Sequence, residues 1–148
     1  MDQFAEFVGN HLMLMTMFTL VSVALIWNLT QEQIGGIPRL SPVEAVQLMN
    51  HEEALVLDVR EQSEYQQGHI LGSEHIPLGS FSKHLKKLDK HKNKHVIVSC
   101  QSGARSLQAC HTLKSNDFPH VYNLKGGVLA WHSAQLPLST EKQLKQKT

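Results

Sequence analysis

The hydrophobic pattern divides the chain into two parts. From Phe7 to Leu29 no side chain carries a formal charge, and apolar residues would occupy every face of a helix through this segment. Such a helix spans about 34 Å, which exceeds the roughly 30 Å hydrocarbon core of a bilayer. After Arg39, short apolar runs alternate with amphipathic segments. The first part therefore predicts one transmembrane helix, and the second part predicts a folded domain.

A cleaved signal peptide is the alternative for the first part. Signal peptides begin with a positive segment and end at a small-residue cleavage site. Here Asp2 and Glu6 make the amino-terminal end acidic, and no small-x-small triplet follows Trp27. We therefore expect a retained anchor. Because cytoplasmic flanks are enriched in Lys and Arg and the first basic residue is Arg39, we expect an inner (plasma) membrane location, with the N-terminus outside and the domain in the cytoplasm.

Strands and helices alternate in the second part. Ser41, Pro42 and Glu44 form a capping sequence that predicts a helix ending near Asn50. Apolar runs predict strands over residues 54–59, 95–99 and 120–124, and periodic segments predict helices over 61–67, 81–88, 105–114 and 128–134. This alternation indicates an α/β fold with a central, mostly parallel sheet flanked by helices.

These elements set the expected organisation of the chain. An N-terminal tail (1–6) precedes the transmembrane helix (7–29) and a linker (30–40), and the folded domain (41–138) is followed by a Lys-rich tail (139–148) that is expected to be disordered.

Composition excludes several functions. The 14 Lys and Arg residues nearly balance 13 Asp and Glu residues, and the basic residues are not interleaved with aromatic ones, so nucleic acid is not an expected partner. Two cysteines, Cys100 and Cys110, are too few for a small secreted domain held by disulfides. The Lys- and His-rich segment 83–95 lacks tight ligand spacing and predicts a solvated face. We expect neither a metal nor a cofactor.

The candidate chemistry lies in the loop between the predicted strand 95–99 and the helix that follows it. The loop reads Cys100-Gln101-Ser102-Gly103-Ala104-Arg105-Ser106. Backbone N–H groups in such a loop, together with a helix N-terminus, form a concavity suited to an anion, and Gly103 can adopt a positive φ. These donors, the helix dipole and Arg105 would favour a thiolate at Cys100. The alternative is a buried, inert cysteine, but Gly and Arg at these positions favour a nucleophile.

The loop resembles the active-site loop of single-domain rhodaneses, in the form C-x-S-G-x-R-S. Other motifs of that family follow in the family's order between about Ser41 and Pro137: Leu57–Glu61 with Glu64-Tyr65, Gly68–Ser73, Ile76-Pro77, and Leu124–Val128 with Ala130-Trp131. The resemblance implies the three-layer rhodanese-like fold for this part of the chain. The N-terminal segment and the tail lie outside it.

The resemblance also implies a thiosulfate sulfurtransferase-like activity. Cys100 would take a sulfane sulfur from a donor such as thiosulfate and pass it, as a persulfide, to a thiol or cyanide acceptor. The loop from Gln101 to Ser106 would hold the persulfide, and Arg105 would bind the sulfonate oxygens of the donor. Supporting roles are expected for Asp58, Arg60 and Glu64, which would brace the loop or form an ion pair. Core packing is expected for His69, Cys110 and Trp131.

Two other functions would fit parts of this pattern. A phosphatase with a related cysteine loop would carry five residues between its Cys and Arg, whereas four separate Cys100 from Arg105, and the smaller loop favours a persulfide. The other alternative is a rhodanese-fold adaptor that binds integral membrane proteins without obligatory catalysis, because a fold alone does not establish activity. The intact loop favours the enzyme. The expected partners are therefore a sulfur donor, an acceptor and the lipid bilayer, with a membrane protein left open.

Overall fold

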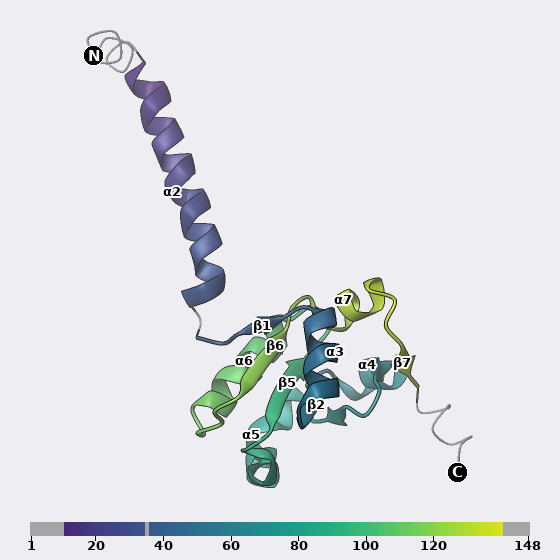
Figure 1. Cartoon of the computed structure of the whole chain (residues 1–148). Coiled ribbons are helices and arrows are strands. Elements are labelled where there is room, and N and C mark those ends of the chain that lie inside the picture. Colours follow the sequence, from purple (N-terminus) through teal and green to yellow (C-terminus); the bar gives the residue numbers. More distant parts are fainter. Residues whose placement is uncertain (1–10, 35, 141–148) are drawn as a thin grey trace. The chain divides into compact units, whose positions relative to one another are not determined.

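The computed structural model describes residues 11–34 and 36–140, and it divides into two units that are treated separately, Met1–Gly36 and Ile37–Thr148. In the described residues of the first unit, Leu12–Ile34 form the helix α2 (Figure 1). Long apolar side chains such as Met13, Phe18 and Leu20 are exposed on this helix. Within the described residues, no helix was found that is long and apolar enough to cross a membrane. The structure thus does not confirm the span predicted over residues 7–29, whose first four residues lie outside the described part.

A five-stranded parallel sheet forms the centre of the second unit. Its strand order is β1-β6-β5-β2-β4, and every neighbouring pair is parallel. The strands are β1 (Arg39–Leu40), β2 (Ala54–Asp58), β4 (Glu74–His75), β5 (His95–Ser99) and β6 (Val121–Leu124), and a separate antiparallel pair joins β3 (His69–Ile70) to β7 (Leu138–Ser139). The predicted α/β class with a parallel central sheet is confirmed.

Helices cover both faces of this sheet (Figure 1). One hydrophobic cluster joins α5 and α6 to Val96 and Val98, and the other joins α3 and α7 to Ile97. Successive residues of β5 thus enter opposite layers, as expected for a strand buried on both faces. The helices are α3 (Pro42–His51), α4 (Gln62–Gln67), α5 (Phe81–Leu88), α6 (Ala104–Lys114) and α7 (Gly127–Ser133), with short 3₁₀ turns η1 (Leu78–Ser80) and η2 (Asp89–His91). The predicted capping box at Ser41 and Glu44 is present.

The ends of the second unit differ from the boundaries expected from sequence. Arg39 and Leu40, predicted as linker, form the edge strand β1 and pair with Asn123 and Leu124. Ser139, predicted as the start of the disordered tail, is buried in β7. Both strands contain only two residues, too few to show a period in the sequence. The rest of the predicted tail, 141–148, lies outside the described residues.

The register of the central strands decides where the polar groups meet. Asp58, the last residue of β2, pairs with Ser99, the last residue of β5. Segments that leave these strands therefore emerge side by side at the carboxyl edge of the sheet, where α/β proteins commonly bind ligands.

Candidate active site

The loop after β5 curls around the Cys100 sulfur. The backbone N–H of Gly103 donates to Sγ at 3.1 Å, and the Ser106 hydroxyl lies 3.3 Å from the same sulfur. Gly103 is the N-cap of α6 and has φ +96°, as its position predicted. A Cβ there would also lie only 3.2 Å from the Leu124 carbonyl oxygen. A side chain at this position would thus strain the turn that directs N–H groups at the sulfur.

Opposing effects act on the Cys100 thiol, which is completely buried. Burial raises its pKa, but hydrogen bonds from the Ser106 hydroxyl and from the backbone N–H groups of Ser106, Gly103 and Ser102 outweigh burial and lower the pKa below that of an ordinary cysteine. Hydrogen bonds from the loop itself therefore favour the expected thiolate. Arg105, which we expected to contribute, is not among the largest effects on this pKa, although its guanidinium interacts electrostatically with Cys100.

Asn123 on β6 holds the cysteine loop through two hydrogen-bond contacts. The sequence analysis did not identify it as a site residue. Its amide nitrogen donates to the Gly103 carbonyl at 3.0 Å, and its amide oxygen lies 2.6 Å from the Ser106 hydroxyl oxygen, so that Asn123 and Cys100 Sγ share the single proton of this hydroxyl. Asn123 is only 2% exposed. A buried polar side chain inside an apolar strand requires partners, and this was the signal available in the sequence.

Replacing Ser106 by Ala should raise the pKa of Cys100, because a side-chain hydrogen bond that favours the thiolate is removed. The rate of alkylation by iodoacetamide, measured against pH, should shift to higher pH and be several-fold slower near neutrality. Ser102→Ala is the matched control, since Ser102 acts through its backbone N–H, which alanine retains. An unchanged pH profile for Ser106→Ala would contradict this assignment.

The Gly126-Gly127 pair explains how α7 holds the other side of the loop. The N–H groups of Val128 and Leu129 donate to the carbonyl oxygens of Cys100 and Gln101 at 2.8 and 3.2 Å. A Cβ on Gly127 would lie 2.2 Å from the Cys100 carbonyl oxygen, and Gly127 has φ +57°. Only glycine permits this approach, so the motif fixes the backbone of the nucleophile.

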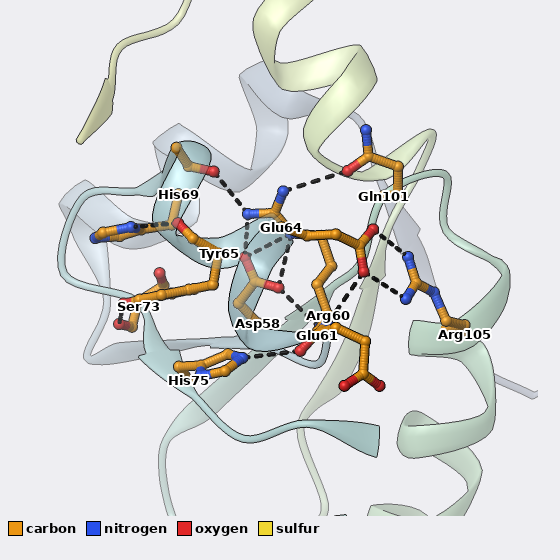
Figure 2. Close-up of polar contacts among 11 residues, drawn as sticks. Asp58, Arg60, Glu61, Glu64, Tyr65, His69, Ser73, His75, Gln101 and Arg105 are labelled. Atoms are coloured by element: carbon orange, nitrogen blue, oxygen red, sulfur yellow. Dashed lines mark hydrogen bonds and ion pairs between the residues drawn. The ribbon is translucent and has the colours of Figure 1, made fainter. Parts of the chain in front are cut away.

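Arg60 connects β2 to the cysteine loop (Figure 2). Its guanidinium binds both carboxylate oxygens of Asp58, with a shortest distance of 2.7 Å, and also donates to the Gly68 carbonyl at 2.7 Å and to Oε1 of Gln101 at 3.2 Å. Asp58 is completely buried and Arg60 is 3% exposed. Arg60 and Asp58 thus lie where they can brace the loop through the residue that follows Cys100.

An aromatic stack lies next to the Asp58–Arg60 ion pair. The Tyr65 ring lies between His69 and His75, with centroid distances of 3.9 and 4.4 Å. Nε2 of His75 lies 2.8 Å from the Arg60 carbonyl oxygen (Figure 2). His69 is buried in this stack, in keeping with the packing role expected for it.

Glu64 and Arg105 form a second ion pair at the loop (Figure 2). Two parallel hydrogen bonds of 2.7 and 2.8 Å join the guanidinium to the carboxylate. The bond from Arg105 lowers the pKa of Glu64 to about 2, and Glu64 in turn raises the pKa of Arg105. The ion-pair partner of Glu64 is therefore Arg105, and a bracing role for Arg60 remains a prediction.

Cys110 lies on α6 in the core, as expected. It is fully buried, and its Sγ lies 3.5 Å from the Tyr122 carbonyl oxygen. Burial raises the pKa of this thiol to about 12. Cys110 is therefore protonated at neutral pH and is a poor nucleophile.

A pocket of about 310 Å³ adjoins the loop at Gln101. Its lining combines polar and apolar side chains, including those of Arg60, Glu64, Gln101, Val128, Leu129 and Leu138. In the part of the chain that the structure describes, no group of three or more His, Cys, Asp or Glu residues could hold a metal ion.

Comparisons with known proteins agree with this architecture. A family model described as "Rhodanese-like domain" matches residues 41–134. The uncharacterized protein YibN of Escherichia coli (strain K12) is 32% identical over 139 residues, which cover 93% of this chain and 97% of the relative. Thiosulfate sulfurtransferase GlpE of Glaesserella parasuis is 30% identical over 99 residues, which cover 67% of this chain and 90% of the relative. A crystal structure of a rhodanese-related protein from Thermoplasma volcanium aligns with a TM-score of 0.64 at 26% identity, covering 70% of this chain and 99% of that chain.

Proposed function

Because this chain belongs to the rhodanese-like domain family, which includes sulfurtransferases, we propose that it moves a sulfane sulfur through a persulfide on Cys100. The observation that carries the proposal is the loop around Sγ, in which the Gly103 N–H and the Ser106 hydroxyl lie within 3.3 Å of the sulfur. Their hydrogen bonds favour the thiolate, which is the reactive form of a cysteine.

The proposed reaction has two steps. The Cys100 thiolate attacks the outer sulfur of a donor such as thiosulfate, the sulfur–sulfur bond of the donor breaks, and sulfite leaves with the bonding electrons. An acceptor thiolate or cyanide then attacks the outer sulfur of the persulfide, which returns Cys100 as a thiolate and forms a new persulfide or thiocyanate. The N–H groups that face Sγ would stabilise negative charge in both steps.

We also propose that Arg105 binds the donor, but in competition with Glu64. Each terminal nitrogen of its guanidinium donates one hydrogen bond to Glu64, so a donor has to share the guanidinium with that carboxylate or displace it. Gln101, Ser102, Ala104 and Ser106 complete the proposed persulfide loop.

The full-length protein, incubated with thiosulfate and measured by intact mass, should gain one sulfur atom. A peptide map should place this sulfur on Cys100, and addition of cyanide should remove it and yield thiocyanate. A protein that gains no sulfur from thiosulfate or from a thiosulfonate would refute the proposed enzyme and favour the adaptor.

We also propose that residues 7–29 anchor the protein in the inner (plasma) membrane, with the domain in the cytoplasm. The proposal rests on a segment without formal charge and on the first basic residue occurring only at Arg39. Similarity to YibN over 93% of the chain extends into this N-terminal segment, so the two proteins share more than the domain.

Extraction and labelling test the anchor. The full chain should remain with membranes in alkaline carbonate, whereas a variant lacking residues 1–29 should be released. A cysteine introduced at Gln3 should react with an impermeant maleimide added outside intact cells. Release of the full chain by carbonate would refute the anchor, and labelling at Gln3 only after permeabilisation would reverse the proposed orientation.

A further inference from the structure

We infer that Glu64 sets the donor specificity of this site. By holding Arg105, it withholds a positive charge from thiosulfate and favours donors that bear less negative charge, in which the sulfane sulfur is attached to an organic group. The inference rests on the proposed sulfur transfer and deepens it, because it names the chemical class of the donor.

Two arginines near the loop are each paired with a carboxylate. Arg60 is paired with Asp58, and Arg105 is paired with Glu64 through two hydrogen bonds of 2.7 and 2.8 Å. These four side chains thus supply no net positive charge. The N–H groups of the loop and the helix α6 offer an anion a partial positive charge that is smaller than that of a free guanidinium.

A doubly charged donor meets a direct competitor at Arg105. Glu64 and Arg105 are partly exposed, at 29% and 38%, so the pair is accessible to a donor. Arg105 also interacts electrostatically with Cys100, which places the guanidinium within range of the reacting sulfur. Thiosulfate bound to Arg105 would therefore share the guanidinium with Glu64 or displace it, and in both cases the nearby carboxylate would repel the dianion. A donor with one charge fewer experiences about half of this repulsion.

The neighbouring pocket offers space that thiosulfate does not need. It has a volume of about 310 Å³ and begins at Gln101, the residue after the nucleophile. Val128, Leu129 and Leu138 give it an apolar side. An organic group on the donor would bury apolar surface there, which adds binding free energy that an inorganic donor lacks.

Thiosulfonates are suitable probes because they form the same persulfide as thiosulfate but carry one negative charge fewer. Methanethiosulfonate carries a methyl group where thiosulfate carries a charged oxygen. The Cys100 thiolate attacks its terminal sulfur, the sulfur–sulfur bond breaks, and methanesulfinate leaves with the electron pair, so the same persulfide forms from both donors.

The experiment measures the second-order rate constant of persulfide formation for both donors by intact mass. Glu64→Gln removes one negative charge and should raise the rate with thiosulfate about tenfold, but with methanethiosulfonate only about threefold, because interaction energy is proportional to the charge of the donor. Glu61→Gln is the matched control. Glu61 precedes the same helix, and its attraction is the weakest of the effects on the Arg105 pKa. Both rates should change by less than about twofold in this control.

If Glu64→Gln changed the rates of both donors by the same factor, or slowed the reaction with thiosulfate, the inference would be overturned. Glu64 would then act only by positioning Arg105. A comparison that needs no variant uses the wild-type protein and free 2-mercaptoethanol. The protein should prefer methanethiosulfonate over thiosulfate more strongly than the small thiol does, and an equal preference would also overturn the inference. A wild-type protein that neither donor modifies would instead refute the proposed sulfur transfer itself.

Discussion

Replacement of Cys100 by Ser should lower the rate of thiocyanate formation from thiosulfate and cyanide by at least about a thousandfold. A serine hydroxyl is not ionised at neutral pH and cannot form a persulfide, while the loop donors at Gly103 and Ser106 can still bind its oxygen. The variant should therefore fold normally and gain no sulfur in intact mass.

Cys110→Ala is the matched control for this variant. It also removes a buried thiol, but one whose pKa is raised to about 12 and which packs in the core. Its rate should stay within about threefold of wild type, with a small loss of stability from the missing atom. Persulfide on the Cys100→Ser protein, or loss of activity only in Cys110→Ala, would move the nucleophile away from Cys100. A cellular role that survives Cys100→Ser would favour the adaptor alternative.

Replacement of Arg60 by Leu should lower the free energy of unfolding by about 3 to 5 kcal/mol. Asp58 is completely buried, and the variant leaves its carboxylate without the cation that binds both of its oxygens. Gln101 loses a hydrogen-bond donor at the same time, so the cysteine loop should be less well held. Urea denaturation followed by circular dichroism measures the loss, and the sulfur-transfer rate of the folded fraction should fall about tenfold.

The double variant Asp58→Asn/Arg60→Leu distinguishes an unpaired charge from lost packing. Asparagine removes the buried charge but can still accept the hydrogen bond that the Arg60 backbone N–H donates to Asp58, since that N–H remains in the variant. The double variant should thus recover at least half of the stability lost by Arg60→Leu. Equal stability of the single and double variants would mean that the ion pair contributes mainly through packing.

The central elements of the domain could be predicted because their signals are local. Strand β5 has the predicted bounds, His95–Ser99, since a run of β-branched residues buried on both faces leaves a clear pattern. Helix α6 begins one residue before the predicted start. By contrast, β1 and β7 contain two residues each and exist because distant strands bind them, so no local period marks them.

In the site too, features set by local sequence could be predicted, whereas features set by contacts between distant residues could not. The Gly103 turn follows from the order of residues around Cys100, and the structure has the positive φ that this order predicted. The pairing of Glu64 with Arg105 does not follow, because two arginines and two carboxylates meet at one sheet edge and only their positions decide the partners. Asn123 was missed for a related reason, since its partners Gly103 and Ser106 are far from it in sequence.

The attachment of the cysteine loop limits how far a sulfur on Cys100 would move in the proposed reaction. The Cys100 carbonyl is held by the Val128 N–H, its side chain is completely buried, and Asn123 fixes the turn that surrounds it. A second sulfur extends only about 2 Å beyond the first. In the proposed reaction, the protein would therefore not deliver the sulfur on a mobile side chain or loop. An acceptor has to bring its own thiol to the loop, so a protein acceptor would need that thiol on a projecting or flexible segment.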